Sequence, residues 1–409
     1  MFTSSLHVIE PTPRRDPRVR AMPYPYKAWL CMSNDPDNTL YKDWQELHAL
    51  IWEELSLPFG DTLFLRSLNQ HLPEQVDLDR YPHILEAHPH DGLHTWGDYL
   101  FAGDRAFHRP DAEQAVAHLR TIGFRPRVWV DHSMFIGNML HRNTLGGLPE
   151  FKDASGNVYP NQVYTLDLVR EVGIRYLWNG TVTNVIGQDR QQGLWNEHVQ
   201  RAGARTQGTI NYMLHRFGGP LSLGQGFREQ VVDNEAYHRL RFPDGSRFYV
   251  FPRYGDAPLA DIDGLGELLS AEDMDELCLR GGTCIVYMHL GKRPPARMND
   301  PRHVPPRTEA ALRALAKRYR DRDIMLSSVS KLMDYLVLRD HLDIDEATHT
   351  IHFRSDGIAF DRVGAAELAG HSFSFGGLAP GNYSVLSSDG QLHTESSWVD
   401  GILTLNFSS

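Results

Sequence analysis

Short apolar runs of strand length alternate with amphipathic helical segments along most of the chain, and this alternation restricts the possible folds most strongly. The apolar runs lie at residues 28–33, 61–67, 83–87, 125–133, 174–180 and 283–291. Helical segments lie at residues 44–55, 112–123, 165–173, 308–321 and 327–342. Strands that alternate with helices form parallel βαβ units. The sequence therefore predicts an α/β fold, with its parallel sheet either open or closed into a barrel.

Three regions depart from this alternation. Residues 1–26 are punctuated by proline and predict an extended lead-in to the α/β region, which we place at residues 27–342. Residues 187–262 predict an insertion beside the site, because two alternating runs flank the hairpin signal PDGS at residues 243–246. Residues 343–409 lack helical periodicity and predict a small antiparallel β module.

Composition argues against several classes of partner. The chain has 409 residues and a formal net charge of -11, whereas nucleic acid binding favours a basic surface. No run of about eighteen apolar residues occurs, so we expect no membrane span. The N-terminal segment lacks the apolar core of a signal peptide, and the three cysteines are too scattered for a disulfide framework. These features predict a cytoplasmic protein.

Acidic or histidine side chains follow several of the predicted strands. In chain order they are Asp35 and Asp37, His90 and His94, Asp131 and His132, and His289. Functional residues gather at the carboxyl ends of the strands in parallel α/β sheets and barrels. We therefore expect these side chains to converge on one site.

The stretch HPHDGLHTW, residues 88–96, is the densest of these sets. His90 and His94 are four residues apart, so on a helical turn they would share one face and could bind one divalent metal. A histidine pair on its own is more typical of a solvated loop, and the metal interpretation depends on the other strand ends. We interpret His88, which precedes Pro89, as a loop residue and Asp91 as a helix cap.

Together these residues predict a hydrolytic metal site. Asp37, His90 and His94 fit the ligands of a zinc-like ion, with cobalt or nickel as alternatives, and leave positions open for water and a substrate carbonyl. Asp35 fits a general base that takes the proton of the water, and His289 fits a general acid that protonates the leaving amine. Such a site would hydrolyse an amide or an ester.

The order of the motifs resembles that of the polysaccharide deacetylases, carbohydrate esterase family four and its relatives, over about residues 27–340. SNDPDN is similar to the family's first motif, which supplies a base and a metal ligand, and HDGLH is similar to the second, which completes the metal site. FRPRVWVDHS, GIRYLWNG and IVYMHLG occupy the places of the third to fifth motifs. The resemblance implies a distorted (β/α) barrel, one divalent metal and removal of an acetyl group from a sugar by hydrolysis of its linear amide C–N bond.

The chain departs from the family pattern in ways that indicate a divergent member. Pro36 separates two aspartates that are adjacent in the family, so their roles are exchangeable, and we expect Asp35 as base and Asp37 as ligand. His132 is not part of the common third motif, so it could bind substrate or replace a ligand. The insertion at residues 187–262 matches no core pattern of the family.

Three further residues are candidate substrate contacts. They are Arg127, Asp131 and Trp178. Arg127 is also a candidate partner of the carboxylate base, provided that its side chain points inward from an alternating strand. A tryptophan inside an apolar run, like Trp178, is typical of packing as well.

We therefore expect a cytoplasmic deacetylase that acts on an N-acetylated sugar, such as an intermediate of surface polysaccharide or glycoconjugate biosynthesis. Deacylation of another small amide is the alternative within the same chemistry. A catalytically inactive barrel that binds glycan or scaffolds a partner is the alternative from another class, and it would hold no stoichiometric metal. A glycosidase is disfavoured, because Asp35 and Asp37 are too close in sequence to flank a glycosidic bond.

Overall fold

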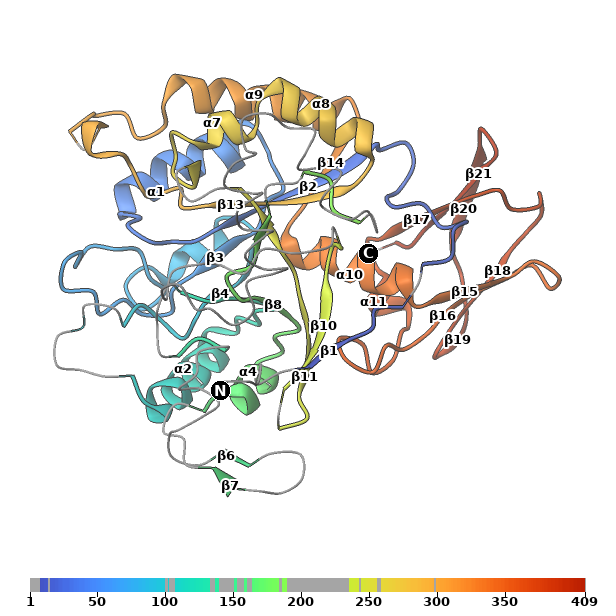
Figure 1. Ribbon diagram of the computed structural model, residues 1–409, viewed down its shortest axis with the longest axis horizontal. Coiled ribbons are helices and arrows are strands. Elements are labelled where there is room, and N and C mark those ends of the chain that lie inside the picture. The colour runs from blue at the N-terminus through green and yellow to red at the C-terminus, as the bar shows by residue number, and fades with distance from the viewer. Residues whose placement is uncertain are drawn as a thin grey trace, which may run out of the picture.

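The computed structural model describes residues 8–13, 15–99, 102, 107–132, 137–139, 151–152, 158–159, 164–183, 186–189, 235–242, 244–255, 259–297 and 299–408. In these parts the chain is a mixed α/β protein, and its central strands run mostly parallel in two sheets (Figure 1). The α/β class that the alternation of runs predicts is therefore confirmed. Within the described chain, no helix has the combined length and apolar character that a membrane crossing requires.

The two central sheets bring distant segments together in parallel register. The larger has the order β1 (Val8–Glu10), β10 (His238–Arg241), β11 (Arg247–Val250), β8 (Tyr176–Trp178), β5 (Val128–Val130), β4 (His90–His94) and β3 (Asp61–Leu63), and is parallel from β11 to β3. The smaller is parallel throughout, in the order β14 (Ile324–Leu326), β2 (Ala28–Asn34), β13 (Thr283–Met288), β12 (Arg253–Tyr254) and β9 (Val182–Thr183).

Helices cover the outer faces of both sheets. α1 (Tyr41–His48), its continuation η1 (Ala49–Glu54), α7 (Leu265–Leu268), α8 (Ala271–Arg280) and α9 (Pro306–Arg320) lie above β2 and β13 in Figure 1. α2 (Arg109–Ile122) and α4 (Leu166–Glu171) lie beside the larger sheet. The ends of α2 follow local rules, since Pro110 stands in its first turn and Gly123 ends it at φ 69°.

Alternation along β2 explains how this strand joins two cores. Ala28, Leu30 and Met32 pack in one cluster with the outer helices, whereas Trp29 and Cys31 face a second cluster that includes α10 (Val329–Asp340). Successive side chains of a strand point to opposite faces, so a strand between two apolar layers is apolar throughout. β2 is accordingly buried along its whole length.

The prediction of a strand at residues 83–87 is wrong. Pro82–Glu86 forms a short 3-10 helix, η2, in which only Ile84 is buried, and Pro82 stands in its first turn as helices prefer. The strand begins later, at the histidine stretch itself: β4 comprises His90–His94. The predicted hairpin is confirmed, because β10 and β11 pair antiparallel around residues 242–246. β11 and β12 then continue into the two central sheets.

The C-terminal residues form two small sheets. One has the order β15 (Leu342–Asp345), β16 (Thr350–Phe353), β18 (Ser384–Ser387) and β19 (Gly390–Leu392), and the other β17 (Ser372–Gly376), β21 (Ile402–Asn406) and β20 (Glu395–Val399). β16 and β18 are parallel and α11 (Ala365–Leu368) precedes β17, so the expectation of antiparallel strands without helices is wrong in these two details. An antiparallel pair, β6 (Phe151–Lys152) with β7 (Val158–Tyr159), and a short 3-10 helix, η4 (Pro295–Arg297), complete the described elements.

Candidate metal centre

The carboxyl ends of β2, β4, β5 and β13 carry the side chains of the candidate site. β2 and β13 pair in register up to Asn34 and Met288, so the next residues on the two strands, Asp35 and His289, emerge side by side. The Asp35 N–H donates to the Met288 carbonyl at 2.8 Å and extends this pairing. A turn follows, in which Thr39 N–H donates to the Pro36 carbonyl and Asn38 adopts φ 61°, a region that asparagine tolerates.

Asp37, His94 and His132 form the central cluster. Nε2 of His132 lies 2.9 Å from Oδ1 of Asp37, and Nε2 of His94 lies 3.7 Å from Oδ2 of the same carboxylate. All three residues are buried, and one ligand atom from each lies within 4.8 Å of the other two. A carboxylate and two imidazoles are a usual zinc donor set.

The orientation of His94 supports a ligand role. Its Nδ1–H donates to the Val130 carbonyl at 3.1 Å, because a carbonyl oxygen only accepts. Nε2 therefore carries the lone pair; it is buried and has no hydrogen-bond partner among the described residues. Metal-binding histidines characteristically direct their other ring N–H to a backbone carbonyl in this way. The three residues thus fit a divalent metal.

Asp35 is held by a buried arginine. Arg253, in β12, donates from both terminal nitrogens to the two oxygens of Asp35, at 2.5 and 2.9 Å, and it is 0% exposed. Its guanidinium lies 3.2 Å from the ring centre of Trp178 and 4.1 Å from that of Tyr287. Burial alone would raise the pKa of Asp35, but Arg253 and His94 outweigh burial and lower it. Asp35 is therefore ionised at neutral pH.

Asp37 and His132 shift each other's titration. Burial acts to raise the pKa of Asp37, but His132, His289 and His94 together hold it well below its usual range. Burial acts to lower the pKa of His132, but the Asp37 carboxylate raises it. Burial dominates at His94 and lowers the pKa of that imidazole, which favours its neutral, ligating form.

His289 faces both carboxylates. Its Nδ1–H donates to the Ala260 carbonyl at 2.9 Å, and its Nε2 lies 3.2 Å from Oδ2 of Asp37 and 3.6 Å from Oδ2 of Asp35. Asp35, Asp37 and His289 thus form a second set whose ligand atoms lie within 4.8 Å of one another. Because Asp37 belongs to both sets, they make up one continuous site.

The structure does not bring His90 to this site. β4 is a strand, so side chains four residues apart are separated by about 13 Å, and the expected helical face shared by His90 and His94 is wrong. His90 Nε2–H donates to the Ile84 carbonyl at 2.6 Å, and burial lowers the pKa of His90 to about 4. His132 stands beside Asp37 in its place.

Arg127 and Asp131 also lie outside the cluster, whereas His132 belongs to it and Trp178 contacts Arg253 beside it. Arg127 precedes β5 at the other end of the strand and forms an ion pair with Asp334 of α10. Asp131 accepts from the Trp129 indole N–H at 2.9 Å and from the Met139 N–H at 3.0 Å, so it shapes the loop that presents His132.

Sequence reasoning missed two basic residues of the site. Arg253, and not Arg127, is the partner of Asp35, the expected carboxylate base. A charged side chain within the apolar run FYVFPRY could have indicated Arg253 in the sequence. Lys292, whose ammonium lies 3.6 Å from Oδ2 of Asp37, follows His289 by three residues. Only the packing of β12 beside β13 brings Arg253 to Asp35.

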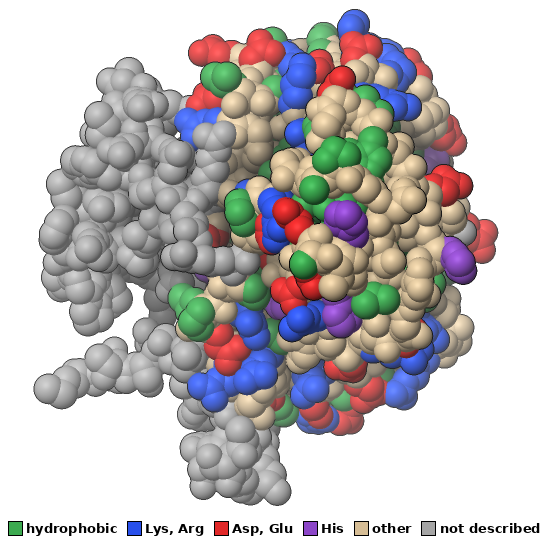
Figure 2. Space-filling view, turned by 90° about the vertical axis from the view of Figure 1, so that its right-hand side faces the viewer, with side chains coloured by type: hydrophobic (Ala, Val, Ile, Leu, Met, Phe, Trp, Pro, Cys, Tyr) green, Lys and Arg blue, Asp and Glu red, His purple; other side chains and the backbone are tan. Residues whose placement is uncertain are grey.

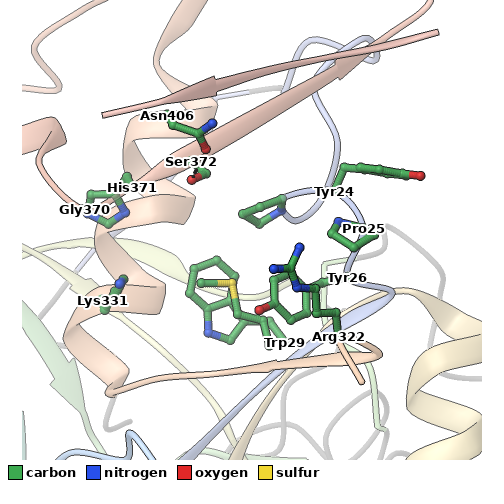
Figure 3. A pocket seen from close by; sticks show the side chains of 12 residues that line it. Tyr24, Pro25, Tyr26, Trp29, Arg322, Lys331, Gly370, His371, Ser372 and Asn406 are labelled. Carbon is green, nitrogen blue, oxygen red and sulfur yellow. Dashed lines mark hydrogen bonds between the residues drawn. The ribbon is translucent and has the colours of Figure 1, made fainter. Parts of the chain in front are cut away.

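Two cavities elsewhere in the described structure are separate from this site. One, of about 290 Å³, lies between the lead-in, β17 and the start of β2, and Tyr24, Lys331 and His371 line it (Figure 3). The other, of about 560 Å³, adjoins Arg127 at the amino ends of β5 and β8. Both lie at strand ends opposite to those that carry the histidine and aspartate cluster.

Comparisons with protein-family models, with curated proteins and with solved structures found no match for this chain. The fold and the site define its class: a mixed α/β protein with mostly parallel sheets and with buried histidine–aspartate clusters whose donor atoms suit a divalent metal.

Proposed function

We propose that the chain is a metal-dependent hydrolase that removes an acetyl or related acyl group from the nitrogen of a sugar unit. The observation that carries this proposal is the convergence of Asp37, His94 and His132 beside a separate carboxylate, Asp35, which Arg253 keeps ionised. Hydrolytic metal sites need this division between ligands and a base that does not bind the ion. The sugar and its acyl group follow from the resemblance to the polysaccharide deacetylases.

The order of the strands supports the barrel that this resemblance implies. β3 at the edge of the larger sheet lies next to β2, since the Thr62 hydroxyl donates to the Asn34 carbonyl. At the other junction, β8 and β11 of the larger sheet lead directly along the chain into β9 and β12 of the smaller one. The proposed fold is therefore a distorted (β/α) barrel with its site at the carboxyl ends of the strands.

In this proposal the ligands are Asp37, His94 and His132. His132 takes the role that the sequence predicts for His90, as the departure from the third motif allowed. A zinc-like ion held there, with cobalt or nickel as alternatives, would polarise the amide carbonyl and acidify the attacking water.

The remaining residues move protons. Asp35 takes a proton from the attacking water while the water oxygen forms a bond to the carbonyl carbon. Arg253 fixes the Asp35 carboxylate through both of its oxygens. As the C–N bond breaks, His289 donates a proton from Nε2 to the leaving nitrogen, while its Nδ1–H stays on the Ala260 carbonyl. The products are a carboxylic acid and a free amine.

Two aspartate variants test the assignment. Asp35→Asn should retain stoichiometric metal and lose turnover by about 10²–10⁴, the usual contribution of a general base. Asp37→Asn should lose metal affinity as well, because a ligand is removed. Metal content measured by mass spectrometry and acetate release from a panel of N-acetylated sugars give the two readouts.

His393→Asn, a change at an exposed histidine far along the chain, is the matched control and should leave both readouts unchanged. Acetate release that survives both Asp35→Asn and Asp37→Asn would refute the assignment of these residues to the active site, and a wild-type protein that binds metal but releases no acyl group would refute the hydrolase. A wild-type protein that binds sugar without metal or acetate release would instead establish the inactive, glycan-binding alternative. Release of acyl groups only from small amides that are not sugars would establish the second alternative.

A further inference from the structure

A second cluster of metal-ligating side chains lies outside the site described above. Asp61, His88 and His90 each offer one ligand atom, and these atoms lie within 4.8 Å of one another. From this cluster we infer a second metal site, built for a zinc-like divalent ion and separate from the Asp37 centre. The inference does not depend on the proposed activity, since it concerns other residues and its test counts metal ions.

The backbone places these residues together. Asp61 opens β3 and His90 opens β4, and the two are partners in the parallel pairing of these strands. The Asp61 N–H also donates to the carbonyl of Pro89, the residue between the two histidines. The segment that leads into β4 is thus fixed against the start of β3.

The histidines direct unused lone pairs into the cluster. His90 Nε2–H donates to the Ile84 carbonyl, so Nδ1 carries the lone pair, and it is buried with no hydrogen-bond partner among the described residues. The His88 side chain is 1% exposed, and neither of its ring nitrogens has a hydrogen-bond partner there. A buried polar group without a hydrogen-bond partner destabilises the folded protein. A bound cation would provide a partner for one nitrogen of each ring.

Asp61 is oriented as a ligand would be. Its Oδ1 accepts from the Asn34 side-chain amide at 2.8 Å, and its Oδ2 lies 3.8 Å from Nε2 of His88. Such a hydrogen bond to the outer oxygen is typical of ligating carboxylates, whose second shell fixes their direction. Two imidazoles and one carboxylate are a donor set that zinc accepts, with water in the fourth position.

Aromatic rings cover this second site. The His88 ring stacks on Trp52 with centroids 3.7 Å apart and planes 13° apart. His48 lies beside it, but its nitrogens face Glu53 and the Ala87 carbonyl. Because Asp61 and His88 are buried and His90 is half-buried between the starts of two strands, the metal would be structural and would join β3 to the entry of β4.

Metal counting in a variant that lacks the first centre tests the inference. The full-length double variant His94→Asn/His132→Asn is freed of metal with a chelator, loaded with Zn²⁺ and dialysed before its metal content is measured. We expect one ion per chain, and none after His88→Phe is added. His88→Phe keeps a flat ring on Trp52 and removes both nitrogens, so a role in stacking alone would survive it.

A double variant that is folded by circular dichroism and holds no zinc would overturn the inference, as would an ion that persists after His88→Phe. If the double variant fails to fold, the same zinc measurement on the wild-type protein, with and without His88→Phe, tests the inference. Two ions per chain, reduced to one by His88→Phe, support the second site, whereas a count that His88→Phe does not change overturns it.

Discussion

Asp35 and Arg253 form a buried, bidentate ion pair in the candidate site. Both groups are almost completely buried, and the arginine binds both carboxylate oxygens while it lies between two aromatic rings. Removing one partner of such a pair leaves a buried charge uncompensated, at a cost of about 3–5 kcal/mol. Arg253 therefore fixes Asp35, the proposed base, in place and lowers its pKa.

Arg253→Lys should move the acidic limb of the activity profile to higher pH. Lysine keeps a positive charge but cannot bind both oxygens, so the pKa of Asp35, which Arg253 lowers, should rise. A base with a higher pKa is protonated at a higher pH, and activity is then lost earlier on acidification. The pH dependence of kcat/KM for acetate release measures the shift.

Metal content provides the control, because Arg253 contacts none of the proposed ligands and the variant should retain its ion. A loss of activity that is uniform across pH would contradict the positioning role.

Burial of His371 predicts a loss of stability in mild acid. This residue lines the cavity shown in Figure 3, and burial, with Lys331 and Arg127 nearby, lowers its pKa from 6.5 to about 4. The unfolded chain therefore binds a proton between these values that the folded chain does not. The stabilising contribution is present above pH 6.5 and is lost as the pH falls towards 4, by about 2 kcal/mol at pH 5.

Urea unfolding at pH 7 and pH 5 tests this, with His371→Gln as the comparison. The variant should lose less stability than the wild type between the two values. Equal losses in both proteins would contradict the prediction.

At the level of elements, the approach of β4 to β5 depends on a glycine. A Cβ atom at Gly92 would lie 1.9 Å from the Val128 carbonyl oxygen, so no side chain fits without separating the two strands. Gly92→Ala should lower the free energy of unfolding by at least about 1–3 kcal/mol, the usual cost of overpacking. It should also weaken metal binding, because His94 lies two residues further along β4.

Gly376→Ala is the matched control for this prediction. Gly376 ends β17, and a Cβ atom there would meet no atom within 4 Å. Urea unfolding of both variants gives the comparison. A Gly92→Ala protein as stable as the control would show that the strands can separate without cost.

Long periodic segments were predictable from the sequence, whereas some short strands, β4 and β14 among them, were not. β2, β13, α2, α9 and α10 follow from burial on both faces or from helical spacing. β4 is decided by its pairing with β3 and β5, and the spacing of His90 and His94 alone was ambiguous between helix and strand. Asp91 does cap a helix, as expected, but its carboxylate accepts from Val329 and Ser330 of α10, which no local pattern shows.

Residues of the candidate site could be predicted from the sequence where the end of the preceding strand could be predicted. Asp35, Asp37, His132 and His289 each follow a recognisable apolar run, whereas His94 was expected after a strand at residues 83–87 that is a 3-10 helix. The contacts between these residues were not predictable from the sequence, because tertiary packing determines them. Arg253, for example, lies on a two-residue strand within a segment that we interpreted as an insertion.

In the whole molecule, the C-terminal sheets share a core with the α/β region. Phe353, Phe373 and Leu405 pack in the same buried cluster as Trp29 of β2 and the helix α10, and α10 is buried along almost its whole length. The lead-in also reaches this region, where the Arg20 N–H donates to the Ser374 carbonyl. On the face turned to the viewer in Figure 2, acidic and basic side chains are intermixed.

Deletion of residues 343–409 should therefore prevent folding and not release an independent barrel. The shortened chain would expose the apolar side of α10 to water, at roughly 25 cal/mol for each Å². We expect it to aggregate or to lose its cooperative unfolding transition, measured by circular dichroism on heating. A soluble fragment of residues 1–342 with a sharp transition would establish the C-terminal module as a separate domain.

Asn34 lies between the two histidine–aspartate clusters, and both the nitrogen and the oxygen of its side-chain amide form hydrogen bonds. Its nitrogen donates to Asp61, and its oxygen accepts from the Leu290 N–H, next to His289. An amide cannot reverse without breaking both bonds, so it transmits orientation from one cluster to the other. The proposed ion uptake at Asp61 and the proposed proton transfer at His289 would then be thermodynamically linked, so that each would alter the free energy of the other.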